Sequence, residues 1–141
     1  MTTPPMDSGL VRKAIDFHGH WCPGLAIGVR AAQWALQEMG KAPDEEIVAV
    51  VETDMCGVDA IQALMGCTFG KGNLIHRDYG KTAFAFYRRR DGKSVRLVFN
   101  PAIYADVGQE MGQLRRKQSE RGLIPQRNFS YRLSCQDGVA C

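Results

Sequence analysis

The sequence lacks any long apolar segment. No run of about 18 apolar residues, the length that a helix needs to cross a bilayer, occurs in the 141 residues. The first residues, MTTPPMDSGL, also lack the basic start and the apolar centre of a secretion signal. These two absences argue against a membrane protein and favour a soluble, cytoplasmic one.

Excess charge of one sign is also lacking. The formal net charge is +3, from 18 Lys and Arg against 15 Asp and Glu, which is too small to indicate a nucleic-acid partner. The basic runs RRR (88–90) and RRK (115–117) are typical of a hairpin tip and a solvated helix face. The chain has no internal repeat and no low-complexity tract. We therefore expect one domain, because a chain of this length can bury roughly two-thirds of its surface around a single core.

Zinc-finger cysteine spacing is absent as well. Five cysteines occur, but no two are spaced as C-x-x-C. An odd number cannot pair completely, and thiols in a chain without a secretion signal are commonly ligands or nucleophiles. The cysteines are therefore candidates for chemistry, and they are Cys22, Cys56, Cys67, Cys135 and Cys141.

The strongest helical signal follows Pro23. Proline is favoured at the first position of a helix because its missing N–H group costs nothing there. We predict a helix over about residues 23–39, ended by Gly40. The apolar residues that recur at helical spacing are Leu25, Val29, Ala32, Leu36 and Met39.

Strand signals come next. The run EIVAVVET (46–53) is apolar and rich in β-branched residues, which predicts a central strand covered on both faces. VDAIQALMG (58–66) predicts a short helix, and CTFGKGNLIHRDYG (67–80) predicts a long glycine-rich loop of the kind that is often functional. KTAFAFYRR and SVRLVFN flank an Asp91-Gly92 turn and predict a β-hairpin.

The C-terminal third predicts one more helix and one more strand. The helix begins at Asn100 and Pro101 and ends at Gly122, and RNFSYRLS (127–134) alternates as a half-buried strand does. The resulting order of elements predicts an α+β fold, with helices packed on a mostly antiparallel sheet. We expect a single core domain over residues 1–134 and a tail, CQDGVAC, over residues 135–141.

The stretch FHGHWCPG (17–24) places two of the three histidines beside a cysteine. If the segment before the proline is extended, His18, His20 and Cys22 point to one side, because the strand period is two. The start of the following helix favours a thiolate. Two imidazoles and a thiolate suit zinc first, then iron, cobalt or nickel. The simpler alternative is a small buried cysteine with capping or surface histidines.

A second group of polar residues follows the predicted central strand. TDMCGVD (53–59) places Asp54, Cys56 and Asp59 at the carboxyl end of that strand, where α/β packing tends to open a crevice. Cys67 comes one short helix later and is either a further ligand or a core cysteine. Lys71 in the glycine-rich loop could hold an anion, although neither GCTFGKG nor IHRDYGKT has the spacing of a P-loop.

Three motifs, FHGHWCPG, CGVDAIQALMGCTFGKGNL and DYGKTAFAFY, together resemble the core domain of the formylmethanofuran dehydrogenase E-subunit family over about residues 10–122. The resemblance implies an α+β core, often an intertwined homodimer, with a metal near the histidine and cysteine motifs and an association with a molybdenum or tungsten enzyme. Longer members add a treble-clef zinc finger with four cysteine ligands. Here only a C-x5-C pair remains, which cannot close such a site alone. The residues that match the family are His18, His20, Cys22, Cys56, Asp59, Cys67, Lys71 and Asn73.

Three functions stay open on the sequence. The first is a non-catalytic accessory protein, a homodimer that binds zinc or another divalent transition metal and serves a redox system or a metalloenzyme partner. The second is an enzyme whose open metal site activates water or a thiol substrate, with Asp59 or His20 as general base and Lys71 holding an anionic group. The third is a metal-independent thiol switch at Cys22. The metal ligands predicted for the first are Cys22, His18, Cys56, His20 and Cys67.

Overall fold

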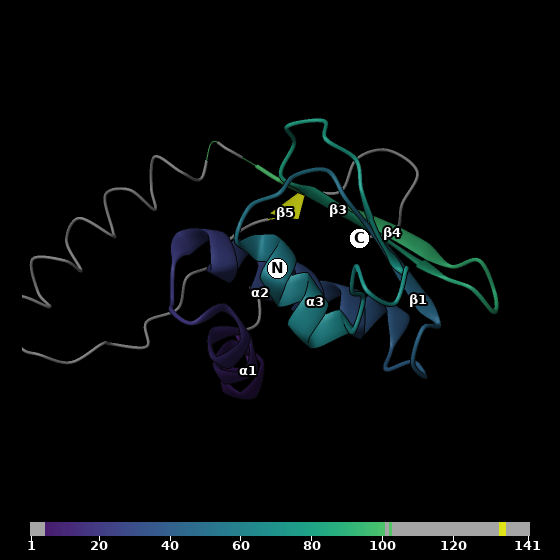
Figure 1. The fold of residues 1–141 in the computed structure, drawn as a ribbon, viewed down its shortest axis with the longest axis horizontal. Coiled ribbons are helices and arrows are strands. Elements are labelled where there is room, and N and C mark those ends of the chain that lie inside the picture. Colours follow the sequence, from purple (N-terminus) through teal and green to yellow (C-terminus); the bar gives the residue numbers. More distant parts are fainter. Residues whose placement is uncertain (1–4, 101, 103–132, 135–141) are drawn as a thin grey trace, which may run out of the picture.

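The fold is a sheet with helices packed against one face (Figure 1). The computed structural model describes residues 5–100, 102 and 133–134. Within these residues the α+β class, with helices on a mostly antiparallel sheet, is confirmed. The elements in chain order are α1 (Ser8–His18), α2 (Pro23–Met39), β1 (Ile47–Val51), α3 (Gly57–Met65), β2 (Leu74–His76), β3 (Ala83–Arg88), β4 (Ser94–Phe99) and β5 (Leu133–Ser134).

The strand β1 lies inside the sheet, whose order is β2-β1-β3-β4-β5. It pairs in parallel with β2 and antiparallel with β3, so that Val50 lies between Ile75 and Ala85. The predicted hairpin is present as β3 and β4, with Gly92 at a positive φ of 69° in its turn. Alternate residues of β1 are buried under the helices, but Val48 and Val50 are only half-buried. The strand was predicted to be covered on both faces. The face under the helices is buried, whereas the face that carries Val48 and Val50 is only partly covered.

The helices α2 and α3 approach one another at two glycines. A Cβ atom on Gly28 would lie only 2.2 Å from the carbonyl oxygen of Gly57. No side chain fits into that gap, so the two backbones are in direct contact. As a result, the first turns of α2 and α3 lie side by side. Most of α2 is buried, and its apolar residues share one core with Phe84, Phe86 and Leu97 of the sheet.

The helix α1 has no counterpart among the elements predicted from the sequence. Its ends are nevertheless marked locally: Leu10 N donates to Asp7 Oδ1 at 2.9 Å, and Gly19, in the left-handed region at φ 98°, donates its N–H to Ile15 O at 2.7 Å. This helix packs across α2 and α3 on the side away from the sheet (Figure 1). His18 is thus the last residue of a helix, and the extended segment assumed before Pro23 is wrong at this position.

The predicted glycine-rich loop contains the edge strand β2. Asn73, only 1% exposed, organises this segment, because its Nδ2 donates to Ile47 O at 3.1 Å and its Oδ1 accepts from Thr68 N at 3.0 Å. A strand of three residues is too short to show alternation in the sequence. The prediction of a loop without secondary structure is therefore wrong at its centre.

Several predictions fall outside the described residues. They include the helix between Pro101 and Gly122, the tail over residues 135–141 and most of the final strand. The described part of that strand, β5, pairs antiparallel with the end of β4, as Phe99 opposite Leu133. The division into a core over residues 1–134 and a tail stays a prediction. No helix in the described residues is long and apolar enough to cross a membrane.

Candidate metal centre

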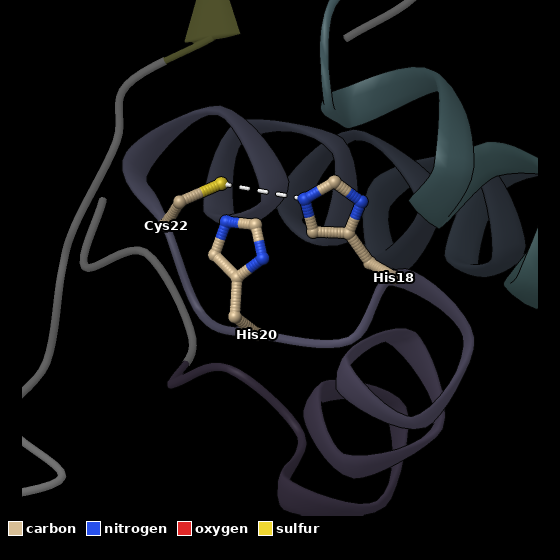
Figure 2. Close-up of side chains that lie close together, drawn as sticks. All are labelled: His18, His20 and Cys22. Atoms are coloured by element: carbon tan, nitrogen blue, oxygen red, sulfur yellow. Dashed lines mark hydrogen bonds between the residues drawn. The ribbon is translucent and has the colours of Figure 1, made fainter.

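Three side chains converge between the end of α1 and the start of α2 (Figure 2). His18 ends α1, His20 lies in the turn, and Cys22 is the N-cap of α2. One ligand atom from each lies within 4.8 Å of the other two. The predicted convergence is therefore present, but a helix end and a tight turn at Gly19 produce it.

The orientation of His18 is set by Asp59. His18 Nδ1 donates to Asp59 Oδ2 at 2.7 Å, across 41 positions of sequence. The other carboxylate oxygen, Oδ1, accepts from Gln62 Nε2 at 3.4 Å. Because the carboxylate is an acceptor, it holds the proton on Nδ1 and leaves Nε2 with a free lone pair in the neutral imidazole. That nitrogen faces the sulfur of Cys22 at 3.8 Å.

The thiol of Cys22 caps the start of α2. Its backbone is extended, at φ −145° and ψ 164°, and its Sγ accepts from Leu25 N at 3.3 Å. The amide groups at a helix start carry partial positive charge, and the N–H group of Leu25 is directed at this sulfur. His18 is mostly buried and His20 is exposed, so the cluster is open on the side of His20.

A second thiol borders the cluster from α3. Cys56 precedes α3 as its N-cap and makes no side-chain cap bond. It packs against the first turn of α2, where a Cβ atom on Gly24 would lie 3.2 Å from Cys56 Cβ and 3.7 Å from Cys56 Sγ. Burial raises the pKa of the Cys56 thiol, and the nearby Cys22 thiol raises it further. Asp54, two residues earlier, is exposed.

The other two predicted site residues lie at the far end of α3. Cys67 is fully buried, donates to Ile47 O at 3.3 Å, and has its pKa raised by burial to about 11. Lys71 forms an ion pair with Asp44, close to Gly66 where α3 ends. A nine-residue helix is about 13 Å long. The fold therefore does not bring Cys67 or Lys71 to the histidines.

The converged side chains fit a zinc-like ion. Bond lengths of about 2.0 Å to nitrogen and 2.3 Å to sulfur in a tetrahedral site place these two ligand atoms roughly 3.6 Å apart. The separation between His18 Nε2 and Cys22 Sγ, 3.8 Å, is close to that value. Imidazole and thiolate ligands suit zinc and the later divalent metals of the first row. A carboxylate behind a ligating histidine is the usual second partner in such sites.

Gln62 is the contributor that the sequence prediction missed. Its side chain supports Asp59, which in turn orients His18. The signal is present in the sequence as the spacing of three between Asp59 and Gln62, because such residues are neighbours on a helix face. This spacing indicates a supporting role for Gln62 only once the contact between Asp59 and His18 is known. That contact joins α3 to α1, which are distant in the sequence.

Comparison with known proteins gives a family. A family model described as "FmdE, Molybdenum formylmethanofuran dehydrogenase operon" matches residues 17–133. A protein of Archaeoglobus fulgidus named "Probable S-adenosyl-L-methionine-binding protein" is 41% identical over 97 residues, which are 64% of this chain and 26% of that protein. The chain thus spans about a quarter of the length of this relative.

A solved structure shares the fold. It is the crystal structure of a tungsten formylmethanofuran dehydrogenase FmdE-like protein from Syntrophus aciditrophicus, with 26% identity and a TM-score of 0.57. The alignment covers 97% of this chain and 78% of that one. The family match begins just before the first histidine of the candidate centre and ends within β5. From these matches we conclude that the chain belongs to the FmdE family.

Proposed function

We propose that this protein is a metal-binding accessory protein of a formylmethanofuran dehydrogenase system. In this proposal, zinc or another divalent transition metal binds at His18, His20 and Cys22. The family description and the name of the Syntrophus aciditrophicus structure support the link to a molybdenum or tungsten enzyme. The metalloenzyme is thus the partner that we propose.

One observation carries the metal proposal: the line of atoms from Asp59 through His18 to Cys22. A histidine that only caps a helix needs one hydrogen bond. Here one ring nitrogen is occupied by a carboxylate, while the other faces a sulfur at nearly the distance that a shared metal requires. The exposed ring of His20, 4.5 Å from that of His18 between centroids, supplies a third donor.

Cys56 is the thiol that we propose as a fourth ligand. It lies next to the cluster, at the start of the neighbouring helix. With Cys56 bound, the coordination sphere is closed, as in structural and carrier sites; without it, one position stays open to water. Cys67 was also predicted as a ligand. Its thiol instead donates a hydrogen bond to the Ile47 carbonyl, at the far end of α3.

The enzyme alternative receives less support from this geometry. Both carboxylate oxygens of Asp59 accept hydrogen bonds, from His18 and Gln62, which favours a positioning role over that of a general base. Lys71, predicted to hold an anionic group, pairs with Asp44 away from the cluster. Only His20 stays close to the candidate metal and exposed.

The homodimer and the cytoplasmic location are also proposals. The family resemblance supports the first, and the sequence composition supports the second. Light scattering on a size-exclusion column measures the mass in solution. A mass twice that of one 15.6 kDa chain supports the dimer, and a mass of one chain contradicts it.

Metal content tests the main proposal. Protein purified without chelator is analysed by inductively coupled plasma mass spectrometry for the wild type, His18→Ala and Cys22→Ser. The matched controls are His76→Ala, which removes the remaining histidine in β2, and Cys67→Ala. We expect near-stoichiometric metal in the wild type and both controls, and loss in both site variants. Equal metal in all five proteins, or none in the wild type, contradicts the proposal.

A further inference from the structure

We propose that Cys22 and Cys56 form a reversible disulfide, and that this bond and the metal compete for the same two sulfurs. Formation of the disulfide rests on the geometry of the two helix starts alone. Its competition with the metal rests on the proposed function. The pair would make the centre a modification site that low-molecular-weight disulfides can reach.

Both cysteines occupy the same structural position on neighbouring helices. Cys22 is the N-cap of α2, and Cys56 is the N-cap of α3. The glycine contact between these helices brings the two starts together: a Cβ atom on Gly57 would lie 3.0 Å from Gly24 O and 3.2 Å from Gly28 N. Residues 34 positions apart in the sequence are thus held on adjacent turns.

The side chain of Cys56 lies against the first turn of α2, which begins after Cys22. Its Cβ would be 3.2 Å from a Cβ on Gly24, two residues after Cys22. Disulfide-bonded cysteines have Cβ atoms about 3.5–4.5 Å apart, so the proposed bond requires the Cβ atoms of Cys22 and Cys56 to come within that range. Cys56 makes no cap bond that its rotation would break.

Accessibility separates this pair from Cys67. Cys22 and Cys56 are both partly exposed, whereas Cys67 is fully buried and donates to a backbone carbonyl. Thiol–disulfide exchange requires in-line attack by an accessible thiolate. Among the cysteines of the described residues, the reaction should therefore select Cys22 and Cys56.

The chemistry balances with a disulfide such as oxidised glutathione as the oxidant. One protein thiolate attacks a sulfur of the oxidant, the S–S bond of the oxidant breaks, and one glutathione leaves as thiolate. The second protein thiolate then attacks the protein sulfur of the mixed disulfide and releases the second glutathione. Two protein thiols lose two electrons and two protons, and the oxidant gains them. A sulfur in the new bond is no longer a thiolate and cannot hold the metal.

Peptide mapping tests the bond itself. Full-length apo protein is treated with oxidised glutathione, alkylated and digested with trypsin without reduction. Cleavage after Lys13, Arg30, Lys41 and Lys71 gives peptides 14–30 and 42–71. We expect a cross-linked pair of these peptides, two hydrogens lighter than their sum, that separates on reduction. Peptide 42–71 holds Cys56 and Cys67, so the cross-link must persist in Cys67→Ala and disappear in Cys22→Ser and Cys56→Ser.

Stable mixed disulfides with glutathione, or a cross-link that persists in Cys56→Ser, would overturn the proposed pair. A second arm repeats the oxidation on zinc-loaded protein, where we expect the cross-link to form several-fold more slowly and zinc to be released in proportion. If the cross-link forms equally fast with and without zinc, the competition is refuted. Loss of metal in His18→Ala without any cross-link in the wild type would retain the metal site and remove only the disulfide.

Discussion

The two ends of α3 hold similar residues in different situations. At its start, Cys56 and Asp59 lie beside the His18 cluster; at its end, Cys67, Lys71 and Asn73 follow one another in the chain. All five residues lie in the motif CGVDAIQALMGCTFGKGNL, on which the family resemblance partly rests. At the first end, the ring nitrogens of His18 and His20 lie close to the sulfur of Cys22, between α1 and α2. At the second end, Cys67 and Asn73 donate hydrogen bonds to a backbone carbonyl, and Lys71 forms an ion pair with a carboxylate.

This comparison shows that residue type does not separate a ligand from a scaffold residue. Cys22 and Cys67 are both thiols, but Cys22 is an N-cap facing an imidazole, and Cys67 donates inward to Ile47 O. The buried amide of Asn73 similarly ties the residues around Cys67 to β1. We therefore expect variants at the first end to change metal binding, and those at the second to change stability.

The largest effect should come from Gly28→Ala, which alters the contact that positions the first end. The new methyl group would lie 2.2 Å from Gly57 O, and backbone cannot yield as a side chain can. We expect a loss of about 3 kcal/mol in the free energy of unfolding, measured by urea denaturation. Gly70→Ala, with no atom within 4 Å of the added carbon, is the control. A stability of Gly28→Ala equal to that of the control would contradict the close backbone contact.

Alkaline pH should distinguish the buried thiol of the second end. Burial raises the pKa of Cys67 to about 11 from an ordinary value of 9.0. Between these values the unfolded chain has lost the proton and the folded chain keeps it, so stability falls as pH rises. Between pH 9 and pH 11, the free energy of unfolding should fall by roughly 2 to 3 kcal/mol because of this group. Urea denaturation of the wild type and Cys67→Ala from pH 8 to 11 measures it; a parallel fall in both proteins would refute this cause.

Asp59→Asn should give the smallest of the three expected changes in free energy, a change in the free energy of metal binding. It should also distinguish most clearly between the roles of the two ends of α3. An amide is a poorer acceptor than a carboxylate, so it should hold His18 less firmly. We expect metal affinity to fall by about 10- to 100-fold with the fold retained, the usual cost of losing such a partner. Competition with a chromogenic chelator measures this affinity. The matched control, Lys71→Met, should bind metal as the wild type does, and a comparable loss there would refute the assignment of the two ends.

Sequence signals from neighbouring residues predicted the parts of the fold that depend only on those residues. The bounds of α2 agree with the prediction because Pro23 and Gly40 act on their own neighbours. The hairpin agrees because its turn requires Gly92 at positive φ. The edge strand β2 was missed because it forms only through pairing with β1 and through the buried side chain of Asn73. The helix α1 was missed although Asp7 and Gly19 mark its ends.

The sequence by itself determined the donor types, the helix start at Cys22 and the cluster of histidines around it. Those properties depend on residues within a few positions of one another, where local geometry is sufficient. Only the tertiary structure decided that Asp59 supports His18 and that Cys56, rather than Cys67, lies beside the cluster. The physical reason is the packing of the helices, with α1 against α3 and α2 on α3 at two glycines. It selects which distant side chains come within bonding distance, a choice that no local pattern encodes.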